Sequence, residues 1–467
     1  MVVFFWTDTL IFLVLGSLLL AFLRFGRKEQ WLRPWRKLTS DKPAMISLVI
    51  LGVFLLIGLL DSIRFYPAHA TASAGSVIVQ GEPISLFDVW ATTIRIHDEK
   101  TYSAPFASHL YTRELLPEGV GSGFWGYARL VHGGAHLEEP DSRVHDILQT
   151  VVQGTAKGLL VAGLLVLSAA IFRSRKKSTS MAKEICQLSG DDFEKPWRSV
   201  LVTGTLILCM GWTLVDLSVH YHVLGTDKVG QDVLYQSLKS IRTGLVIGCL
   251  TTLVTLPFAL VLGIVSGYYR GWVDDLIQYI YTTLNSIPGV LLIAASILVV
   301  QVYMSNHAEA FDTIAVRADT RLLFLCLVLG MTSWTGLCRL LRAETLKLRE
   351  MEYVQAARAL GVGDPGILTR HILPNLFHIV LISITLDFSG LVLAEAVLSY
   401  INIGVDPTTF SWGNMINSAR LEMAREPVVW WPLFAAFLFM FILVLSANLF
   451  ADGVRDALDP RHQSGER

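Results

Sequence analysis

Three carboxylates lie in long apolar stretches of this sequence: Asp216, Asp387 and Glu395. Each stretch has about 20 residues, enough to cross the hydrocarbon core of a bilayer. Ionisable groups are costly there, so they are candidates for a transport path or a gate. Asp387, in mid-stretch, is predicted to line a path, and Glu395, near an end, to act as a gate or interface residue. The alternative for Asp387 is a hydrogen-bonded packing contact, with Ser383, Ser389 or a neighbouring helix.

No residues are spaced for catalysis. The sequence lacks a Gly-x4-Gly-Lys-Ser/Thr phosphate loop, so energy for transport must come from a partner chain or from an ion gradient. His132 and His136 have the i, i+4 spacing of metal ligands on a helix, but Gly133 and Gly134 between them disfavour a helix. The cysteines show no metal-ligand spacing; they are Cys186, Cys209, Cys249, Cys326 and Cys338. We therefore predict no catalytic residue, metal or cofactor on this chain.

The elements that carry these residues are predicted to be membrane helices. Hydrophobic residues make up 53% of the chain and charged residues 16%, against about 25% charged in soluble domains. A net charge of −1 gives no sign of nucleic-acid binding. The first apolar stretch has no basic residue before it, which favours an uncleaved helix over a signal peptide. Nine stretches are predicted to span the membrane: 2–23, 44–60, 151–172, 199–217, 242–267, 276–302, 321–338, 376–400 and 430–450.

The distribution of Lys and Arg predicts the orientation of these spans. The loops at 24–42 and 173–198 are rich in basic residues, which is typical of the cytoplasmic side. The acid-rich segment 61–150 is then outside. Counting spans onward places the loop 339–375 and the C-terminus inside, and the N-terminus outside.

The cytoplasmic loop 339–375 has the pattern of a rigid elbow. Tyr353, Ala356, Ala357 and Leu360 recur at i, i+3, i+4 and i+7, which predicts one face of a helix that Gly361 ends. Asp364 and Pro365 are predicted to cap and start a second short helix, and Pro374 to break it before the next span. The small alanines would allow close approach by another protein.

The order of these residues resembles the EAA loop of ABC-importer permeases, in the dipeptide, oligopeptide and nickel branch. The residues that carry the resemblance are Gln355, Ala356, Ala357, Gly361, Ile372, Leu373 and Pro374. Gln355 replaces the family's Glu, and His371 stands where the family has Ile. The resemblance implies that Tyr353, Leu360 and these residues dock onto an ATPase.

A second match lies at Leu224–Val233, which resembles the branch's Leu-Gly-Thr-Asp-x-x-Gly-Arg-Asp segment on the outer side. Gly225 and Gly230 are expected to form turns, while Asp227 and Asp232 cap the next helix or line the outer mouth. Further segments match in the branch's order, so that the resemblance covers about 198–460: Gly267–Asp274, Glu395–Tyr400, Ser411–Met415 and Asp452–Pro460.

The resemblance implies an all-α polytopic membrane protein with a MetI-like permease core of six transmembrane helices at 198–467. Residues 1–60 and 151–197 would add about three N-terminal helices and a cytoplasmic linker, and 61–150 an extracytoplasmic segment. The function implied is ATP-driven import of peptides or a related small solute through the cytoplasmic membrane. The implied partners are a second permease in a heterodimer, two ATP-binding subunits that use ATP and Mg, an extracytoplasmic substrate-binding protein and membrane lipid. An ion-gradient-driven secondary transporter is the alternative.

The segment 61–150 is not covered by the resemblance. Residues 77–80 and 86–90 are predicted to form short strands. We expect the segment to form a small outside domain that helps to engage the binding protein.

Overall fold

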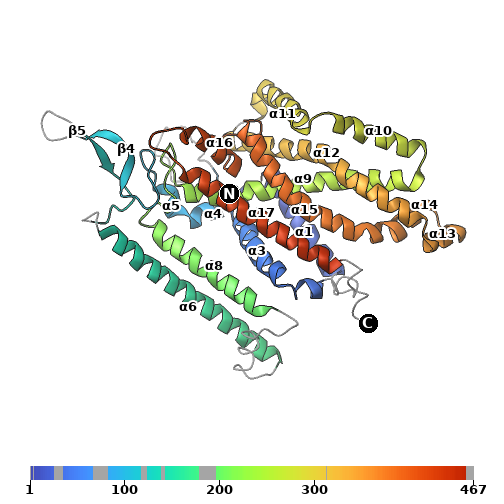
Figure 1. Cartoon of the computed structure of the whole chain (residues 1–467), viewed down its shortest axis with the longest axis horizontal. Coiled ribbons are helices and arrows are strands. Elements are labelled where there is room, and N and C mark those ends of the chain that lie inside the picture. The colour runs from blue at the N-terminus through green and yellow to red at the C-terminus, as the bar shows by residue number, and fades with distance from the viewer. Residues whose placement is uncertain are drawn as a thin grey trace, which may run out of the picture. The chain divides into compact units, whose positions relative to one another are not determined.

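The computed structural model describes residues 2–3, 5–25, 35–66, 83–116, 124–137, 142–177, 196–311 and 313–458, and it is mostly helical (Figure 1). The longer helices are α1 (Trp6–Phe25), α3 (Lys42–Ser62), α6 (Arg143–Lys177), α8 (Trp197–Ser218), α9 (Val233–Tyr269), α10 (Trp272–Ser286), α11 (Gly289–Asn306), α12 (Ile314–Arg349), α15 (Leu373–Tyr400), α16 (Trp412–Glu422) and α17 (Trp431–Leu458). The shorter elements are α4 (Leu86–Trp90), α5 (Thr92–Ile96), η2 (Ala308–Ala310), α13 (Glu352–Ala359), α14 (Asp364–Ile367), the π-helical η3 (Leu368–Ile372), and the strands β1 (Val2–Val3), β2 (Arg64–Phe65), β3 (Ile84–Ser85), β4 (His109–Leu116) and β5 (Phe124–Arg129).

Seven helices in the described part of the chain are long and apolar enough to cross a membrane, which confirms a helical, polytopic fold. They are Lys42–Ser62, Arg143–Arg175, Trp197–Ser218, Val233–Tyr269, Gly289–Asn306, Asp364–Tyr400 and Trp431–Leu458. The other two predicted spans are also helical, 2–23 largely as α1 and 321–338 within α12.

The predicted span at 276–302 is wrong as a single helix. The structure divides it into α10 and α11, with the break at Ile287 and Pro288. Proline has no N–H to donate, and it disfavours the helical conformation of the residue before it. Ile287 accordingly adopts an extended conformation, with φ −90° and ψ 130°.

The described residues form two compact units, which we treat separately. The first comprises Trp35–Arg242 and Phe410–Phe450, together with the start of the chain. It holds α3, α6, α8 and the short elements between α3 and α6. The second contains Thr243–Thr409 and holds most of α9, all of α10 to α15, and α1.

In the first unit, α6 and α8 pack side by side (Figure 1). Gly154 and Gly158, four residues apart on α6, lie directly against the backbone of Thr213 and Cys209 on α8. Small residues at this spacing let two membrane helices approach closely. Lys157, between the glycines, forms an ion pair of 2.8 Å with Asp216. These contacts join α6 to α8, which is the first helix of the region 198–460 that carries the sequence resemblance.

Replacing Gly158 with Leu should separate α6 from α8. A Cβ at Gly158 would lie 2.5 Å from the Cα of Cys209, and overpacking of this kind typically costs about 1–3 kcal/mol. Thr155→Cys, with Cys209 as the sole remaining native cysteine, would report the contact by thiol cross-linking. We expect Gly158→Leu to lower sharply the yield of the disulfide between position 155 and Cys209. Gly163→Leu is the matched control, because no atom lies within 4 Å of its Cβ position. Equal yields in both variants would contradict this packing.

The short elements between α3 and α6 differ from the predicted strands. Residues 86–90 form helix α4 instead, because Ser85 and Asp88 make a capping box in which each side chain accepts a hydrogen bond from the other's backbone N–H. The longer strands are β4 and β5, an antiparallel hairpin in which Leu115 pairs with Trp125. The predicted strand at 77–80 lies outside the described residues.

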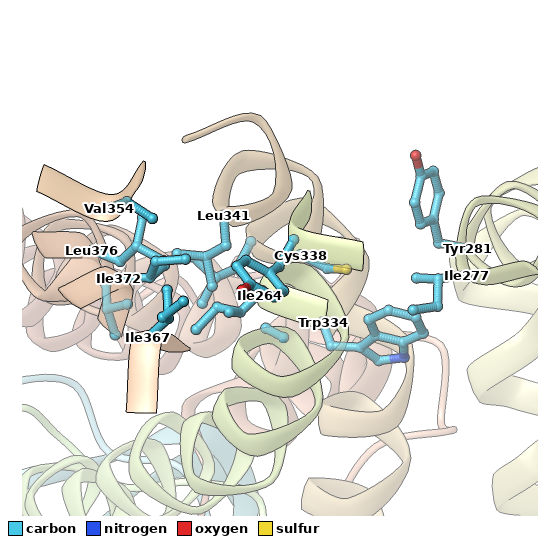
Figure 2. Packing of buried hydrophobic residues seen from close by; sticks show 14 residues of the cluster. Ile264, Ile277, Tyr281, Trp334, Cys338, Leu341, Val354, Ile367, Ile372 and Leu376 are labelled. Atoms are coloured by element: carbon cyan, nitrogen blue, oxygen red, sulfur yellow. The ribbon is translucent and has the colours of Figure 1, made fainter. Parts of the chain in front are cut away.

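The hydrophobic core of the second unit reaches from the membrane helices to the predicted elbow (Figure 2). Val354, Ile367, Ile372 and Leu376 are almost fully buried. They belong to the same cluster as Ile264 of α9 and as Cys338 and Leu341 of α12. The elbow is therefore part of the folded core of this unit.

Candidate coupling surface and transport path

The predicted elbow is present, with two corrections to its geometry. Helix α13 ends before Gly361, whose φ of +80° is the left-handed conformation predicted for a helix end. Asp364 is not the cap of the second helix, because Gly363 holds that position. Contrary to the prediction, Pro374 does not end the second helix before the next span. It lies in the first turn of α15, where its missing N–H is tolerated, and α14, η3 and α15 follow one another without a loop.

The predicted interaction face of α13 divides between the core and the surface. Ala357 is 7% exposed and packs inward beside Val354. Tyr353 and Leu360 are 42% and 85% exposed, and Ala356 is exposed as well. The periodicity predicted the helix correctly. It could not predict that Ala357 packs into the core of this chain, because alanine is equally suited to a core contact and to a contact with another protein. The other three residues of the predicted face form an exposed stripe (Tyr353, Ala356 and Leu360), whose side chains are accessible to solvent.

Tyr268, at the end of α9, holds the elbow in place. Its hydroxyl donates to Asp364 Oδ1 at 2.7 Å and accepts from Arg358 Nη2 at 3.1 Å. Its carbonyl oxygen accepts a hydrogen bond of 2.7 Å from Arg349 at the end of α12. One tyrosine therefore connects α9, α12, α13 and α14. Sequence patterns miss it, because Tyr268 and Asp364 are 96 residues apart.

A two-point ion pair fixes α10 to α12 near the same region. Arg342 Nε and Nη2 each donate to a different oxygen of Asp274, both at 2.6 Å. Such paired bonds fix orientation as well as distance. The hydrogen bonds from Arg342 hold the pKa of Asp274 below its usual range, although partial burial opposes the shift.

The segment Leu224–Val233 forms a tight turn against the residues around Glu99 and Ser103. Gly225 and Gly230 have φ of +71° and +87°, which favour glycine. A Cβ on Gly225 would meet the carbonyl oxygen of Ser103, and one on Gly230 would overlap the backbone of Glu99. Glycine is needed at both positions for the turn and for the close approach.

The two aspartates of this segment order the backbone. Asp227 Oδ1 accepts hydrogen bonds from Val229 N and Gln231 N, both at 2.9 Å. Asp232 Oδ1 accepts from Leu234 N and Tyr235 N at the start of α9, as a helix cap does. The geometry fits the capping alternative for Asp232 alone, since Asp227 Oδ1 accepts hydrogen bonds within the turn that precedes α9.

A buried charge cluster joins this segment to residues 99–133, and we name it the clamp (Glu99, His222 and Asp232). His222 Nδ1 lies 2.8 Å from Asp232 Oδ2, and its Nε2 lies 3.5 Å from Glu99 Oε1. The Glu99 carboxylate also accepts hydrogen bonds from the backbone N–H groups of 131–133, at 2.7 to 3.1 Å. Sequence patterns do not identify the clamp, because Glu99 lies 123 positions before His222 in the chain.

The electrostatics of the clamp favour its ionised form. Burial opposes the charge on His222, but hydrogen bonds and attraction from Asp232 and Glu99 outweigh it and raise its pKa to about 9. Burial likewise opposes the charge on Glu99, yet its hydrogen bonds to His222 and to 131–133 lower its pKa to about 2. At neutral pH the clamp therefore carries one positive charge between two negative ones.

The two candidate path residues lie in different environments on α15. Asp387 lines a cavity of about 260 Å³ between α9, α12 and α15. Glu395 is 2% exposed and accepts a hydrogen bond of 2.7 Å from Ser399 Oγ, one turn further along the helix. It is not among the residues that line the cavity. The predicted contact of Asp387 with Ser383 or Ser389 is not among its interactions; Ser389 Oγ donates to Leu386 O instead.

The described residues contain no group of three or more His, Cys, Asp or Glu side chains placed to hold a metal ion. His132 stacks on His97 with ring centroids 4.6 Å apart, while His136 lies 2.9 Å from Asp146. Their spacing in the sequence therefore does not produce a shared ligand face.

Comparison with known proteins finds similarity over the second half of the chain. Residues 259–464 match the family model described as "Binding-protein-dependent transport system inner membrane component". The oligopeptide transport system permease protein OppC of Mycobacterium tuberculosis is 34% identical over 246 residues, which cover 53% of this chain and 78% of the relative. The glutathione transport system permease protein GsiD of Pectobacterium atrosepticum is 33% identical, over 52% and 74%. The dipeptide transport system permease protein DppC of Alkalihalophilus pseudofirmus is 31% identical, over 52% and 73%.

Proposed function

Because the chain belongs to the family of binding-protein-dependent transport system inner membrane components, we propose that it is the permease subunit of an ABC importer that carries peptides or a related small solute across the cytoplasmic membrane. ATP and Mg are used by partner ATPases. The names of the relatives, with oligopeptides, dipeptides and glutathione as their solutes, support this substrate class.

The observation that carries the proposal is the elbow with its exposed stripe. Tyr353, Ala356 and Leu360 present an apolar surface on a helix that Tyr268 and the buried core hold rigidly. A rigid projection of this kind can transmit the movement of an ATPase to the membrane helices. We assign the stripe, with the neighbouring Gln355 and Gly361, to the ATPase contact.

The remaining partners and the orientation follow from the same proposal. The loop 339–375 and the C-terminus face the cytoplasm, and residues 61–150 face the outside, where a substrate-binding protein delivers the solute. A second permease completes the path as a heterodimer. Residues 198–467 form the MetI-like core, with Asp387 and Glu395 as path or gate residues, and 1–197 are an addition to it.

Purification from the native membrane, followed by reconstitution, tests this function. We expect an ATPase and a second permease to co-purify, and the complex in liposomes to take up labelled peptide only with both ATP and the binding protein. A vanadate-inhibited complex is the control. Uptake that is driven by an imposed ion gradient and does not depend on ATP would reject the proposal in favour of a secondary transporter.

A further inference from the structure

The cavity beside Asp387 has a distinctive chemical lining. Its volume is about 260 Å³, and Asp387 is the one charged residue among those that line it. The apolar part comes from leucines, an isoleucine and an alanine of α9, α12 and α15. The full lining is Thr252, Thr255, Leu256, Ser333, Leu337, Ile384, Leu386, Asp387, Gly390, Leu391 and Ala394.

Both threonine hydroxyls of the cavity already donate a hydrogen bond to a backbone carbonyl oxygen. Thr252 Oγ1 donates to Gly248 O at 2.7 Å, and Thr255 Oγ1 donates to Thr251 O at 2.9 Å. A hydroxyl has one hydrogen to donate and two lone pairs to accept with. What both side chains can offer to a ligand is therefore acceptor oxygen.

Asp387 adds a negative charge to these acceptors. Within the described residues its carboxylate has no ion-pair or hydrogen-bond partner, and the lining contains no Lys, Arg or His. A carboxylate in an apolar region of the membrane is unfavourable unless a cation compensates it. A ligand that brings donors and a positive charge satisfies the cavity, whereas a carboxylate ligand would be repelled.

We propose that Asp387, with Thr252 and Thr255, forms a binding site for a protonated primary amine of the transported solute. An ammonium group has three donors and no acceptor, which complements the Asp387 carboxylate and the acceptor oxygens of Thr252 and Thr255. In a peptide this group is the free amino terminus or a lysine side chain. The inference rests on the proposed function, since it assigns the site to the solute.

Carbodiimide labelling of the purified full complex tests the site without depending on delivery by the binding protein. The carbodiimide adds to the Asp387 carboxyl and rearranges to an N-acylurea, or a bound primary amine displaces the urea and forms an amide. Mass spectrometry of the peptide that contains Asp387 distinguishes the two products, and protection means loss of the N-acylurea. We expect trialanine amide, which has a free amine and no carboxylate, to protect Asp387. N-acetyl-trialanine amide should not. N-acetyl-lysine amide distinguishes the side-chain amine from the amino terminus as the source.

Two outcomes of the labelling would overturn the proposal. Equal protection by the acetylated and free peptides would mean that the cavity recognises shape alone. Protection by sodium chloride at matched ionic strength, with none from the amines, would assign the carboxylate to an inorganic cation. Choline chloride at the same concentration controls for ionic strength.

Transport supplies the second readout. Asp387→Asn should lower ATP-dependent uptake of a free-amine peptide about tenfold to a hundredfold, as expected for a lost charged hydrogen bond. Asp387→Glu should restore part of it. Ser383→Ala, on the same helix but outside the cavity lining, should have no effect. Full uptake by Asp387→Asn would reject the amine site alone, whereas absence of ATP-driven uptake by the unaltered complex would reject the proposed function.

Discussion

A transporter with both Ala356→Glu and Leu360→Glu should lose its ATPase during purification, and its ATP-dependent uptake should fall to background. Leu360 is 85% exposed, on a helix that the buried core holds in place. Two carboxylates in an apolar contact would have to be desolvated without partners. Hot-spot residues near the centre of an interface contribute about 2 kcal/mol or more, so a pair of buried carboxylates at such positions should weaken binding by about 100-fold or more. The ratio of ATPase to permease after purification measures the effect.

Leu421→Glu is the matched control for this pair. Leu421 is 69% exposed and lies in the loop that the span count places outside, so the ATPase ratio should not change. Both altered positions on the elbow are exposed, and the double variant should therefore keep the size-exclusion profile of a folded protein. An ATPase that stays bound to the folded double variant would move the contact away from the stripe.

Replacing Glu99 with Leu should loosen residues 99–133 from the segment Leu224–Val233. The change leaves three backbone N–H groups at 131–133 and the His222 imidazolium without their acceptor. Breaking a buried pair in this way costs about 3–5 kcal/mol. Hydrogen exchange at 131–133 should therefore accelerate by about 100-fold or more. Unchanged exchange would show that the clamp does not hold the two segments together.

Glu114→Leu provides the matched control, because Glu114 forms an exposed ion pair of 2.7 Å with Lys100. Surface pairs of this kind contribute about 0–1 kcal/mol, so exchange at 131–133 should change little. The contrast between the two glutamates separates the clamp from a general effect of removing acid from this segment.

The clamp also gives a pH dependence with a defined sign. The pKa of His222 is raised from 6.5 to about 9, so its contribution is complete below pH 6.5 and is lost as pH rises through about 9. The pKa of Glu99 is lowered from 4.5 to about 2, so its contribution is lost as pH falls through about 2. After correction for intrinsic exchange, protection at 131–133 should be greatest between these limits. In Glu99→Leu the decline toward pH 9 should be shallower.

Local patterns predicted the parts of the site that depend on local geometry. The helix at 352–359 follows from periodicity, and the positive φ of Gly361 follows from its position after that helix. The break at Pro288 was also readable, since a proline inside an apolar stretch disfavours a continuous helix. The prediction failed there because the hydropathy of 276–302 outweighed the proline signal.

Long-range contacts could not be read in the same way. The hydrogen bond between Tyr268 and Asp364, and the ion pair between Glu99 and His222, join residues 96 and 123 positions apart, which no periodicity relates. The burial of Ala357 depends on the position of α13 against α12, which a single sequence does not contain. Tertiary packing determines all three.

The absence of a loop between the elbow and α15 has a mechanical consequence. Residues Asp364–Tyr400 form a helical stretch of 37 residues without a loop, in which Leu368–Ile372 is a π-helical turn. Asp387 lies about 21 Å along this stretch from Leu373 at the usual rise per residue. Between Leu373 and Asp387, α15 is regular helix with no break at which a rotation could be absorbed. Under the proposed function, a rotation of this helix about its axis at Leu373 would therefore re-aim the Asp387 carboxylate within the transport path.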